Sequence, residues 1–409
     1  MTLEIRPVRS QELEEFIFAN LYAFNQDRRP EALHEATIRA GERVDFELPL
    51  AAFVDGRLAA GLRVIPLTIR INGAELPMAG IAGVACLPEY RRRGYVGALL
   101  KRALSDMHDR GQLISALYTP HVALYRRYGW ETAARNIRYS FEPKAVKTIV
   151  APPAAGRLRR VTVDEWPVLN ALYEEYSAGR NSVVVRPEHW WRQRIFGWER
   201  EVTDAAVWED SEGQARGYVI YTTRSGLPPD RPWPQSRLWL RELVTRDANA
   251  YVALVNYLLS HDIHDRIEMS VPPDDPLLSL LDDPHQVRIE AWSSLMLRIV
   301  DVAAALRARG CRPQAEKCRF AMAVRDKVLP WNEGTWLVQT AGNRLSVERH
   351  NGPADLTLDS TVLAAVFNGH LSVREAARAG LVEVTNAAAL GAATTVFSLD
   401  HPPFCLDYF

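Results

Sequence analysis

The chain has 409 residues, with 49 basic and 50 acidic side chains and a formal net charge of −1. Such a balance leaves no global basic field to attract nucleic acid or an anionic membrane. The length exceeds what one ordinary core organises, so two or three domains are expected. The N-terminal stretch MTLEIRPVRS has no signal-peptide apolar region, and no later run is long enough to span a bilayer. We therefore expect a cytoplasmic protein that binds neither nucleic acid nor membrane.

Cysteine and histidine form no metal-binding or disulfide pattern. His261 and His264 are the one close histidine pair, and no cysteine or second pair accompanies them. The scattered cysteines, without CxxC spacing, are expected to be reduced structural thiols. They are Cys86, Cys311, Cys318 and Cys405. We expect no bound metal.

The first 150 residues predict a mixed sheet with helices. Residues 3–8 read as a strand and residues 12–24 as a helix with one apolar face. Further strand-like runs occupy residues 50–54, 61–71, 78–87, 113–118 and 137–141. The Pro- and Ala-rich joint at 151–156 predicts a domain boundary.

Within this segment, IAGVACLPEYRRRGYVGALL at residues 81–100 joins an apolar strand to a helix through an Arg- and Gly-rich turn. A helix N-terminus offers unpaired N–H groups and the positive end of the helix dipole, so it attracts anions. The guanidinium groups add diffuse positive charge that suits a pyrophosphate. The residues expected to hold the anion are Arg91, Arg92, Arg93, Gly94, Tyr95, Val96 and Gly97.

Neither a Walker loop nor a GxGxxG dinucleotide fingerprint fits this turn. Arg91 to Gly94 instead resembles the [RQ]xxG turn of the GNAT acyltransferases, although that family usually has Gly or Ala where this chain has Val96. The resemblance implies acetyl-CoA as co-substrate. It also implies that backbone N–H groups near Val84, Ala85 and Cys86 polarise the thioester. A solvated arginine-rich turn is the alternative interpretation.

A second signal is HVALYRRYGWE, which follows the strand at 113–118. In GNAT enzymes a short helix here carries a tyrosine ahead of an aromatic-Gly-aromatic turn, which matches Tyr125 and then Tyr128 to Trp130. The resemblance implies that Tyr125 donates a proton to the departing thiolate. A phenol suits that task because its pKa near 10 keeps it protonated at neutral pH. A partly buried structural tyrosine is the alternative.

The remaining chain repeats this element order and then changes. From residue 158 the order of strands and helices matches the first domain, but no RxxG turn follows the strand at 238–244. From residue 293 an antiparallel sheet layered with helices is indicated. The whole order resembles the Eis ("enhanced intracellular survival") acetyltransferases. We therefore predict an α/β chain of two GNAT folds with mixed sheets, catalytic 1–150 and degenerate 151–292, before a sterol carrier protein-like domain at 293–409.

The resemblance to Eis proteins also gives the C-terminus a role. In that family the terminal carboxylate serves as the base in the first domain, which here is the carboxylate of Phe409, with Tyr408 and Phe404 as aromatic walls. Asp407 is the second candidate base, and burial of these aromatics in the carrier-like core is the alternative. We expect direct transfer to a neutral amine; an acyl-enzyme on Cys86 is the less favoured route.

The acceptor is the least determined feature. Eis-like enzymes acetylate primary amines of aminoglycoside- or polyamine-like cations or of lysine side chains, and the acidic candidates to bind them are Asp27, Asp45 and Glu47. A non-enzymatic acyl-CoA or lipid carrier and a long-chain N-acyltransferase remain as alternatives. Eis-like proteins form hexamers, so we predict a homohexamer. Aromatic residues predicted to be exposed, and so available between chains, are Trp190, Trp191, Trp198 and Trp233.

Overall fold

The computed structural model describes residues 2–43, 46–197, 203–226, 235–312 and 317–409. The chain forms two compact units, of which the first comprises Met1–Ala133, Ser294–Leu399 and Tyr408–Phe409. The second comprises Ala134–Ser293 and Asp400–Asp407. Among the described helices, none is long and apolar enough to cross a membrane.

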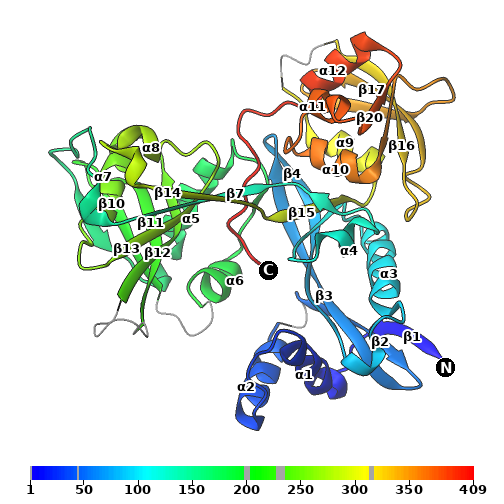
Figure 1. The fold of residues 1–409 in the computed structure, drawn as a ribbon, viewed down its shortest axis with the longest axis horizontal. Coiled ribbons are helices and arrows are strands. Elements are labelled where there is room, and N and C mark those ends of the chain that lie inside the picture. The colour runs from blue at the N-terminus through cyan, green and yellow to red at the C-terminus, as the bar shows by residue number, and fades with distance from the viewer. Residues whose placement is uncertain (1, 44–45, 198–202, 227–234, 313–316) are drawn as a thin grey trace. The chain divides into compact units, whose positions relative to one another are not determined.

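The first unit contains a mixed sheet with strand order β1-β2-β3-β4-β5-β15-β6. Its strands are β1 (Leu3–Pro7), β2 (Leu48–Val54), β3 (Arg57–Ile71), β4 (Ala74–Cys86), β5 (Ile114–Tyr118), β6 (Glu131–Thr132) and β15 (Leu295–Ile299). Its helices are α1 (Leu13–Ala23), α2 (Pro30–Gly41), α3 (Tyr95–Asp109) and α4 (Val122–Arg126). Helix α3 runs along this sheet (Figure 1) and buries Leu99, Leu100 and Leu104 in its core. The predicted strands at 3–8, 50–54, 61–71, 78–87 and 113–118 are confirmed, as is the helix at 12–24.

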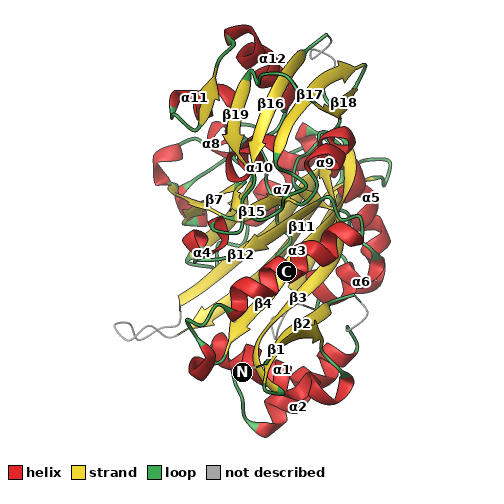
Figure 2. Ribbon diagram, turned by 90° about the vertical axis from the view of Figure 1, so that its right-hand side faces the viewer, coloured by secondary structure: helices red, strands yellow, loops and turns green. Residues whose placement is uncertain are grey.

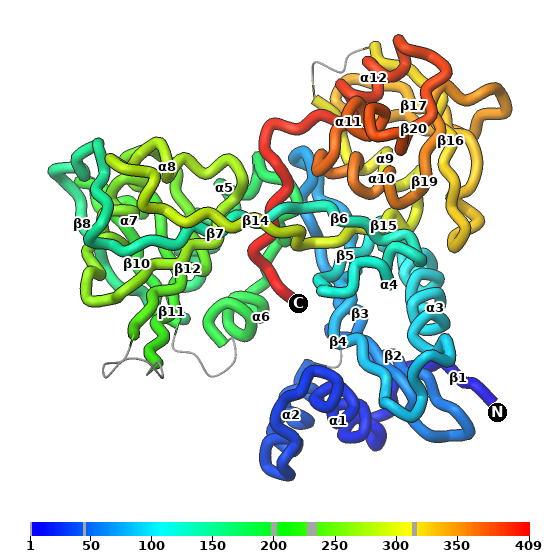
Figure 3. The backbone as a smooth tube through the Cα atoms, in the orientation of Figure 1, coloured from blue at the N-terminus to red at the C-terminus, as the bar shows by residue number. Residues whose placement is uncertain are grey.

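One strand of the predicted first domain belongs elsewhere. The run at 137–141 is a strand, β7 (Arg135–Phe141), but it lies in the sheet of the second unit between β13 (Arg266–Val271) and β14 (Arg288–Ser293). In the first sheet β15 pairs with both β5 and β6 (Figure 3). The assignment of residues 137–141 to the first sheet was therefore wrong, because an apolar run indicates a strand without indicating its partner.

The second unit has its own sheet, with order β14-β7-β13-β12-β11-β10-β8. The strands of this sheet besides β7 are β8 (Arg157–Arg160), β10 (Thr203–Glu209), β11 (Ala215–Gly226), β12 (Gln235–Thr245), β13 (Arg266–Val271) and β14 (Arg288–Ser293). The unit also contains the short strand β9 (Val183–Val184), which is not part of this sheet. Its helices are α5 (Trp166–Ser177), α6 (Glu188–Trp190), α7 (Ala248–Leu259) and α8 (Leu277–Leu280). Only β12 and β13 pair in parallel in this sheet as described, which gives it the mixed character predicted.

The C-terminal part of the first unit is a smaller sheet covered by helices (Figure 2), with order β18-β17-β16-β19-β20. Its strands are β16 (Arg319–Arg325), β17 (Gly334–Ala341), β18 (Arg344–Arg349), β19 (Leu356–Asp359) and β20 (Val382–Val384). Its helices are α9 (Val302–Arg309), α10 (Ser360–Phe367), α11 (Val373–Arg378) and α12 (Ala387–Phe397). The expectation of an antiparallel sheet was wrong for one pair, since β16 and β19 run parallel.

Two buried arginines hold this part together. Arg309 donates to the carbonyl oxygens of Phe367, Val396 and Phe397 at 2.5, 2.9 and 3.0 Å. These carbonyls end α10 and α12, where the helix dipole is negative, so the cation is favourably placed. Arg298 on β15 pairs with Asp326, with Nη2 to oxygen distances of 2.8 and 2.7 Å. This pair ties the smaller sheet to β15 of the first sheet within one unit.

Candidate active site

The arginine-rich turn lies between β4 and α3, as predicted. Gly94 caps α3 with φ = +85°, a left-handed conformation that favours glycine, and a Cβ there would meet open space. Arg92 is also left-handed, with φ = +60°. A non-glycine residue held in this region often marks a functional turn. The first N–H groups of α3, at Tyr95, Val96 and Gly97, have no helical acceptor and face the turn.

The three arginines of the turn are exposed and carry uncompensated charge. Arg91 donates from Nε to the carbonyl oxygen of Cys86 at 3.2 Å, which ties the turn to the end of β4. In the described part of the chain no carboxylate lies within ion-pair distance of Arg91, Arg92 or Arg93. An anion would therefore meet three available cations beside a helix N-terminus.

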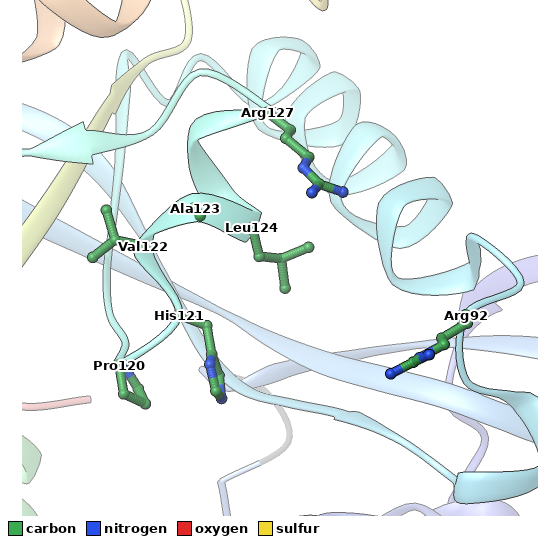
Figure 4. Close-up of a pocket in the computed structure, with 7 residues that line it drawn as sticks. All are labelled: Arg92, Pro120, His121, Val122, Ala123, Leu124 and Arg127. Atoms are coloured by element: carbon green, nitrogen blue, oxygen red, sulfur yellow. The ribbon is translucent and has the colours of Figure 1, made fainter.

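A cavity of about 800 Å³ opens next to this turn. Its walls are Arg92, Pro120, His121, Val122, Ala123, Leu124 and Arg127. Figure 4 shows Arg92 extending into this space from the turn, and Leu124 and Arg127 from the opposite side. Sequence reasoning missed Arg127, although it lies two residues after Tyr125. Nothing local distinguishes it from Arg126, whose guanidinium is paired with Glu131 at 2.6 and 2.8 Å.

This difference between adjacent arginines gives a prediction. Replacing Arg127 with Ala should weaken acetyl-CoA binding about 10-fold, which corresponds to the loss of one charge-assisted hydrogen bond of about 1.5 kcal/mol. Arg126→Ala is the matched control and should leave the affinity nearly unchanged, because that cation is already used by Glu131. Isothermal titration calorimetry of both variants measures this. Equal losses in the two variants would contradict the assignment of Arg127.

Strands β4 and β5 separate beside the cavity. Their parallel pairing ends at Ile81 and Leu117, whereas β4 continues to Cys86. The Leu87 N–H donates to the Ala59 carbonyl. Because N–H groups alternate along a strand, those of Val84 and Cys86 point away from β3, toward the side that β5 has left. Of the three residues predicted from the sequence, Val84 and Cys86 thus present N–H groups to which a thioester carbonyl can bind, whereas the N–H of Ala85 points toward β3.

Burial raises the pKa of the Cys86 thiol, an effect that nearby Arg91 opposes. The thiol donates to the Leu87 carbonyl at 3.6 Å. A protonated thiol is a poor nucleophile, so these surroundings favour direct transfer over an acyl-enzyme.

Tyr125 lies in the same core as α3 and is only 6% exposed. Its ring packs edge-on against Trp130, with the centroids 6.2 Å apart. Burial raises its pKa to about 12, against a smaller lowering by the Thr119 side chain. Tyr125 therefore stays protonated at neutral pH, as a proton donor must. The neighbouring Tyr128 explains Gly97, since a Cβ on that residue would lie 2.0 Å from the Tyr128 hydroxyl.

The C-terminal dipeptide belongs to the first unit. The ring of Phe409 lies 5.3 Å from that of Tyr118, the last residue of β5, and the ring of Tyr408 lies 4.5 Å from it. The Phe409 ring also covers Gly80 on β4. The chain therefore ends against the last paired residues of β4 and β5, next to where these strands separate.

Asp407, by contrast, is bound within the second unit. Its carboxylate accepts hydrogen bonds from Arg186 at 2.9 and 3.2 Å and from the Trp190 indole at 2.7 Å. Arg186 also binds Glu242 at 2.9 Å. Asp407 is 2% exposed, so its oxygens are committed to this network. The structure thus argues against Asp407 as the base. Phe404, expected as an aromatic wall, is likewise buried in the second unit.

The buried network gives a stability prediction. Asp407→Ala leaves Arg186 with one carboxylate, and breaking a buried pair typically destabilises by about 3 to 5 kcal/mol. Asp407→Asn should lower the free energy of unfolding by less than Asp407→Ala, because its amide oxygen still accepts hydrogen bonds. Glu188→Ala is the control: it breaks the exposed Glu188–Arg192 pair, and such pairs contribute about 0 to 1 kcal/mol. Urea unfolding measures all three, and similar midpoints for Asp407→Ala and Glu188→Ala would refute the assignment.

Of the three acidic residues predicted to bind the acceptor, Asp27, Asp45 and Glu47, the structure describes two, and both are paired with arginines. Glu47 is buried and paired with Arg63 at 2.6 Å, and Asp27 is paired with Arg29 at 2.6 Å. Asp45 lies outside the described residues. The two described carboxylates are therefore compensated, which spacing along the chain did not indicate.

The aromatic residues predicted to be exposed are corrected in part. Trp190 and Trp191 are 2% and 0% exposed and lie in the core of the second unit. Trp198 and Trp233 lie outside the described residues. Trp190 and Trp191 are therefore not available as anchors between chains.

The second unit differs from the first at the corresponding helix N-terminus. Helix α7 is capped by the carboxylate of Asp247, which accepts from the Ala250 N–H at 2.9 Å. A carboxylate at this position competes with and repels a phosphate. This supports the interpretation that the second sheet lacks the cofactor-binding turn.

Models of known families match three successive segments. An acetyltransferase (GNAT) domain model matches residues 4–133, a second such model matches residues 182–299, and a sterol carrier protein domain model matches residues 302–406. These matches confirm the tandem GNAT folds and the carrier-like domain.

Relatives over most of the chain bear acetyltransferase names. The chain is 28% identical to a Streptomyces avermitilis protein called an uncharacterized N-acetyltransferase, over 81% of this chain and 82% of the relative. It is 26% identical to N-acetyltransferase Eis of Mycobacterium bovis, over 86% and 83%. Among solved structures, Eis1 from Mycobacterium abscessus aligns over 100% of both chains with a TM-score of 0.81 and 26% identity.

Proposed function

Because the chain belongs to the Eis-like GNAT N-acetyltransferases with a C-terminal sterol carrier protein-like domain, we propose that its acceptors are primary amines. The amine is carried by a small cationic molecule, aminoglycoside- or polyamine-like, or by a lysine side chain. The acetyl group passes directly from acetyl-CoA to the amine nitrogen. The observation that carries the proposal is the left-handed turn at Arg92 and Gly94, which opens onto a cavity beside the α3 N-terminus.

Acetyl-CoA binds through its phosphates at this turn. Arg92 and Arg127 extend into one cavity, so both can contact the same polyanion. The pantetheine then follows β4 where β5 has separated, and the thioester oxygen accepts from the N–H groups of Val84 or Cys86.

The chemical step is a direct displacement. The neutral amine attacks the thioester carbon, a C–N bond forms and the C–S bond breaks. The nitrogen loses its proton to the Phe409 carboxylate as it becomes acidic, and the thiolate takes a proton from the Tyr125 hydroxyl. Because its pKa is about 12, Tyr125 is protonated at neutral pH and its proton is available when sulfur departs.

A thiol-release assay tests this function. Acetyl-CoA and longer acyl-CoAs are each mixed with polyamines, aminoglycosides or lysine peptides, and free CoA is measured. We expect turnover with acetyl-CoA and at least one multi-amine. Faster turnover with long-chain acyl-CoA would favour long-chain N-acyl transfer instead. Tight acyl-CoA binding without thiol release would favour a carrier.

We also propose a homohexamer, on the resemblance to Eis proteins alone, because the buried Trp190 and Trp191 give it no support. Light scattering at micromolar concentration tests it. A monomeric mass would refute it.

A further inference from the structure

Gly80 lies in the middle of β4 and needs an explanation. It pairs with Ile65 on β3 and with Ala116 on β5, so both sides of its backbone are engaged in the sheet. Glycine inside a strand is destabilising by about 0.5 to 1 kcal/mol relative to alanine. Gly80 is also absent from the positive-φ residues, so its backbone conformation does not require glycine. The reason for the glycine is therefore space above the strand.

That space is filled by the side chain of Phe409. A Cβ on Gly80 would lie 2.7 Å from each of two ring carbons of Phe409 and 3.3 Å from a methyl group of Leu67. Real Cβ atoms do not approach other atoms at 2.7 Å. Tyr118 meets the same ring edge-on, with an interplanar angle of 63°. Gly80 and Tyr118 thus form a seat for the Phe409 ring, and all three residues belong to the first unit.

Seating the ring restricts the carboxylate of the same residue. Ring and carboxylate share one Cα, so a ring held between a strand and an aromatic side chain allows few rotamers. A misplacement of about 1 Å in a catalytic group can reduce a rate about 10²-fold. The otherwise flexible end of a chain would rarely meet that tolerance.

We propose that Gly80 is a positioning residue, whose missing side chain lets the Phe409 ring seat on β4 and so directs the terminal carboxylate at the acceptor amine. Tyr118 completes the seat. The inference rests on the proposed function, since it assigns a task to the side chain of the residue whose carboxylate acts as base.

Carboxypeptidase A tests the seat without measuring acetylation. This protease releases a C-terminal aromatic residue once the chain end is free. Gly80→Ala should release phenylalanine at least about 10-fold faster than wild type, because an added methyl group displaces the ring. Gly61→Ala on β3 is the matched control: its methyl group would lie 2.5 Å from the ring of Phe16 on α1, so it should disturb the sheet without freeing the C-terminus. Release from Gly80→Ala at the wild-type or Gly61→Ala rate would overturn the seat.

A double-mutant cycle tests the positioning. Gly80→Ala and Phe409→Ala should each lower kcat about 10- to 100-fold, with little change in KM for acetyl-CoA. Without a ring at position 409 the extra methyl has only the Leu67 methyl group close to it, at 3.3 Å, and that side chain can shift, so the double variant should be no slower than Phe409→Ala. If the reductions in kcat of the two single variants multiplied in the double variant, Gly80→Ala would be damaging the sheet in general, and the proposal would be overturned. Faster phenylalanine release from Gly80→Ala with an unchanged kcat would overturn it as well. If the wild-type protein acetylated no amine, the proposed function would be wrong. The rate of phenylalanine release by carboxypeptidase A would still show whether Gly80 allows the Phe409 ring to pack on β4.

Discussion

Adding one residue after Phe409, or deleting Phe409, is expected to lower kcat for amine acetylation by about 10² to 10⁴, the typical effect of losing a general base. Both changes move the charge away from the reacting nitrogen. Acetyl-CoA affinity should remain nearly intact, because the turn at residues 91–97 lies on a different element. Steady-state thiol release and calorimetry on the same preparations separate the two effects.

An N-terminal tag is the matched control, since it adds comparable length without altering the carboxylate. Tyr125→Phe should also slow turnover, by removing the donor to the thiolate. Its effect should not multiply with that of the C-terminal change, because acid and base act on one transition state. Full turnover by a C-terminally extended variant would contradict the assignment of the Phe409 carboxylate as the base. A water relay would then be the next candidate for the base, because Asp407 is paired with Arg186.

Replacing Arg92 with Glu is expected to weaken acetyl-CoA binding by about 2 to 5 kcal/mol, because a carboxylate then faces the pyrophosphate. Arg110→Glu makes the same charge change at the other end of α3 and should leave the affinity within about twofold. Calorimetry should also find one acetyl-CoA per chain, given the carboxylate cap on α7. Unchanged affinity in Arg92→Glu, or two bound molecules per chain, would overturn the assignment of the first unit as the cofactor site.

The pairing of two of the three predicted acidic residues changes how the acceptor should be sought. With Glu47 bound to Arg63 and Asp27 bound to Arg29, neither described carboxylate is free to select a highly charged cation. A substrate panel should therefore include amines of low charge beside polyamines.

The sequence by itself determined the features whose causes are local. The turn predicted to bind phosphate depends on a strand, a glycine, three arginines and a helix within some twenty residues, so its geometry follows from backbone rules. Tyr125 was predicted from the resemblance of its short helix and glycine turn to those of GNAT enzymes. Fold and family were also readable, because the order of elements spans the whole chain.

Tertiary structure alone decided the features that depend on partners distant along the chain. The apolar runs of β7 and β15 predict strands, yet which sheet each one joins depends on the free edge that a remote segment offers. Arg126 and Arg127 cannot be distinguished in the sequence, and only the structure shows that Arg126 is paired with Glu131. Gly80 appears as an unexplained strand glycine until the last residue of the chain packs on it. Charge compensation and close packing depend on which side chains are neighbours in space, and the spacing of residues along the chain does not indicate those neighbours.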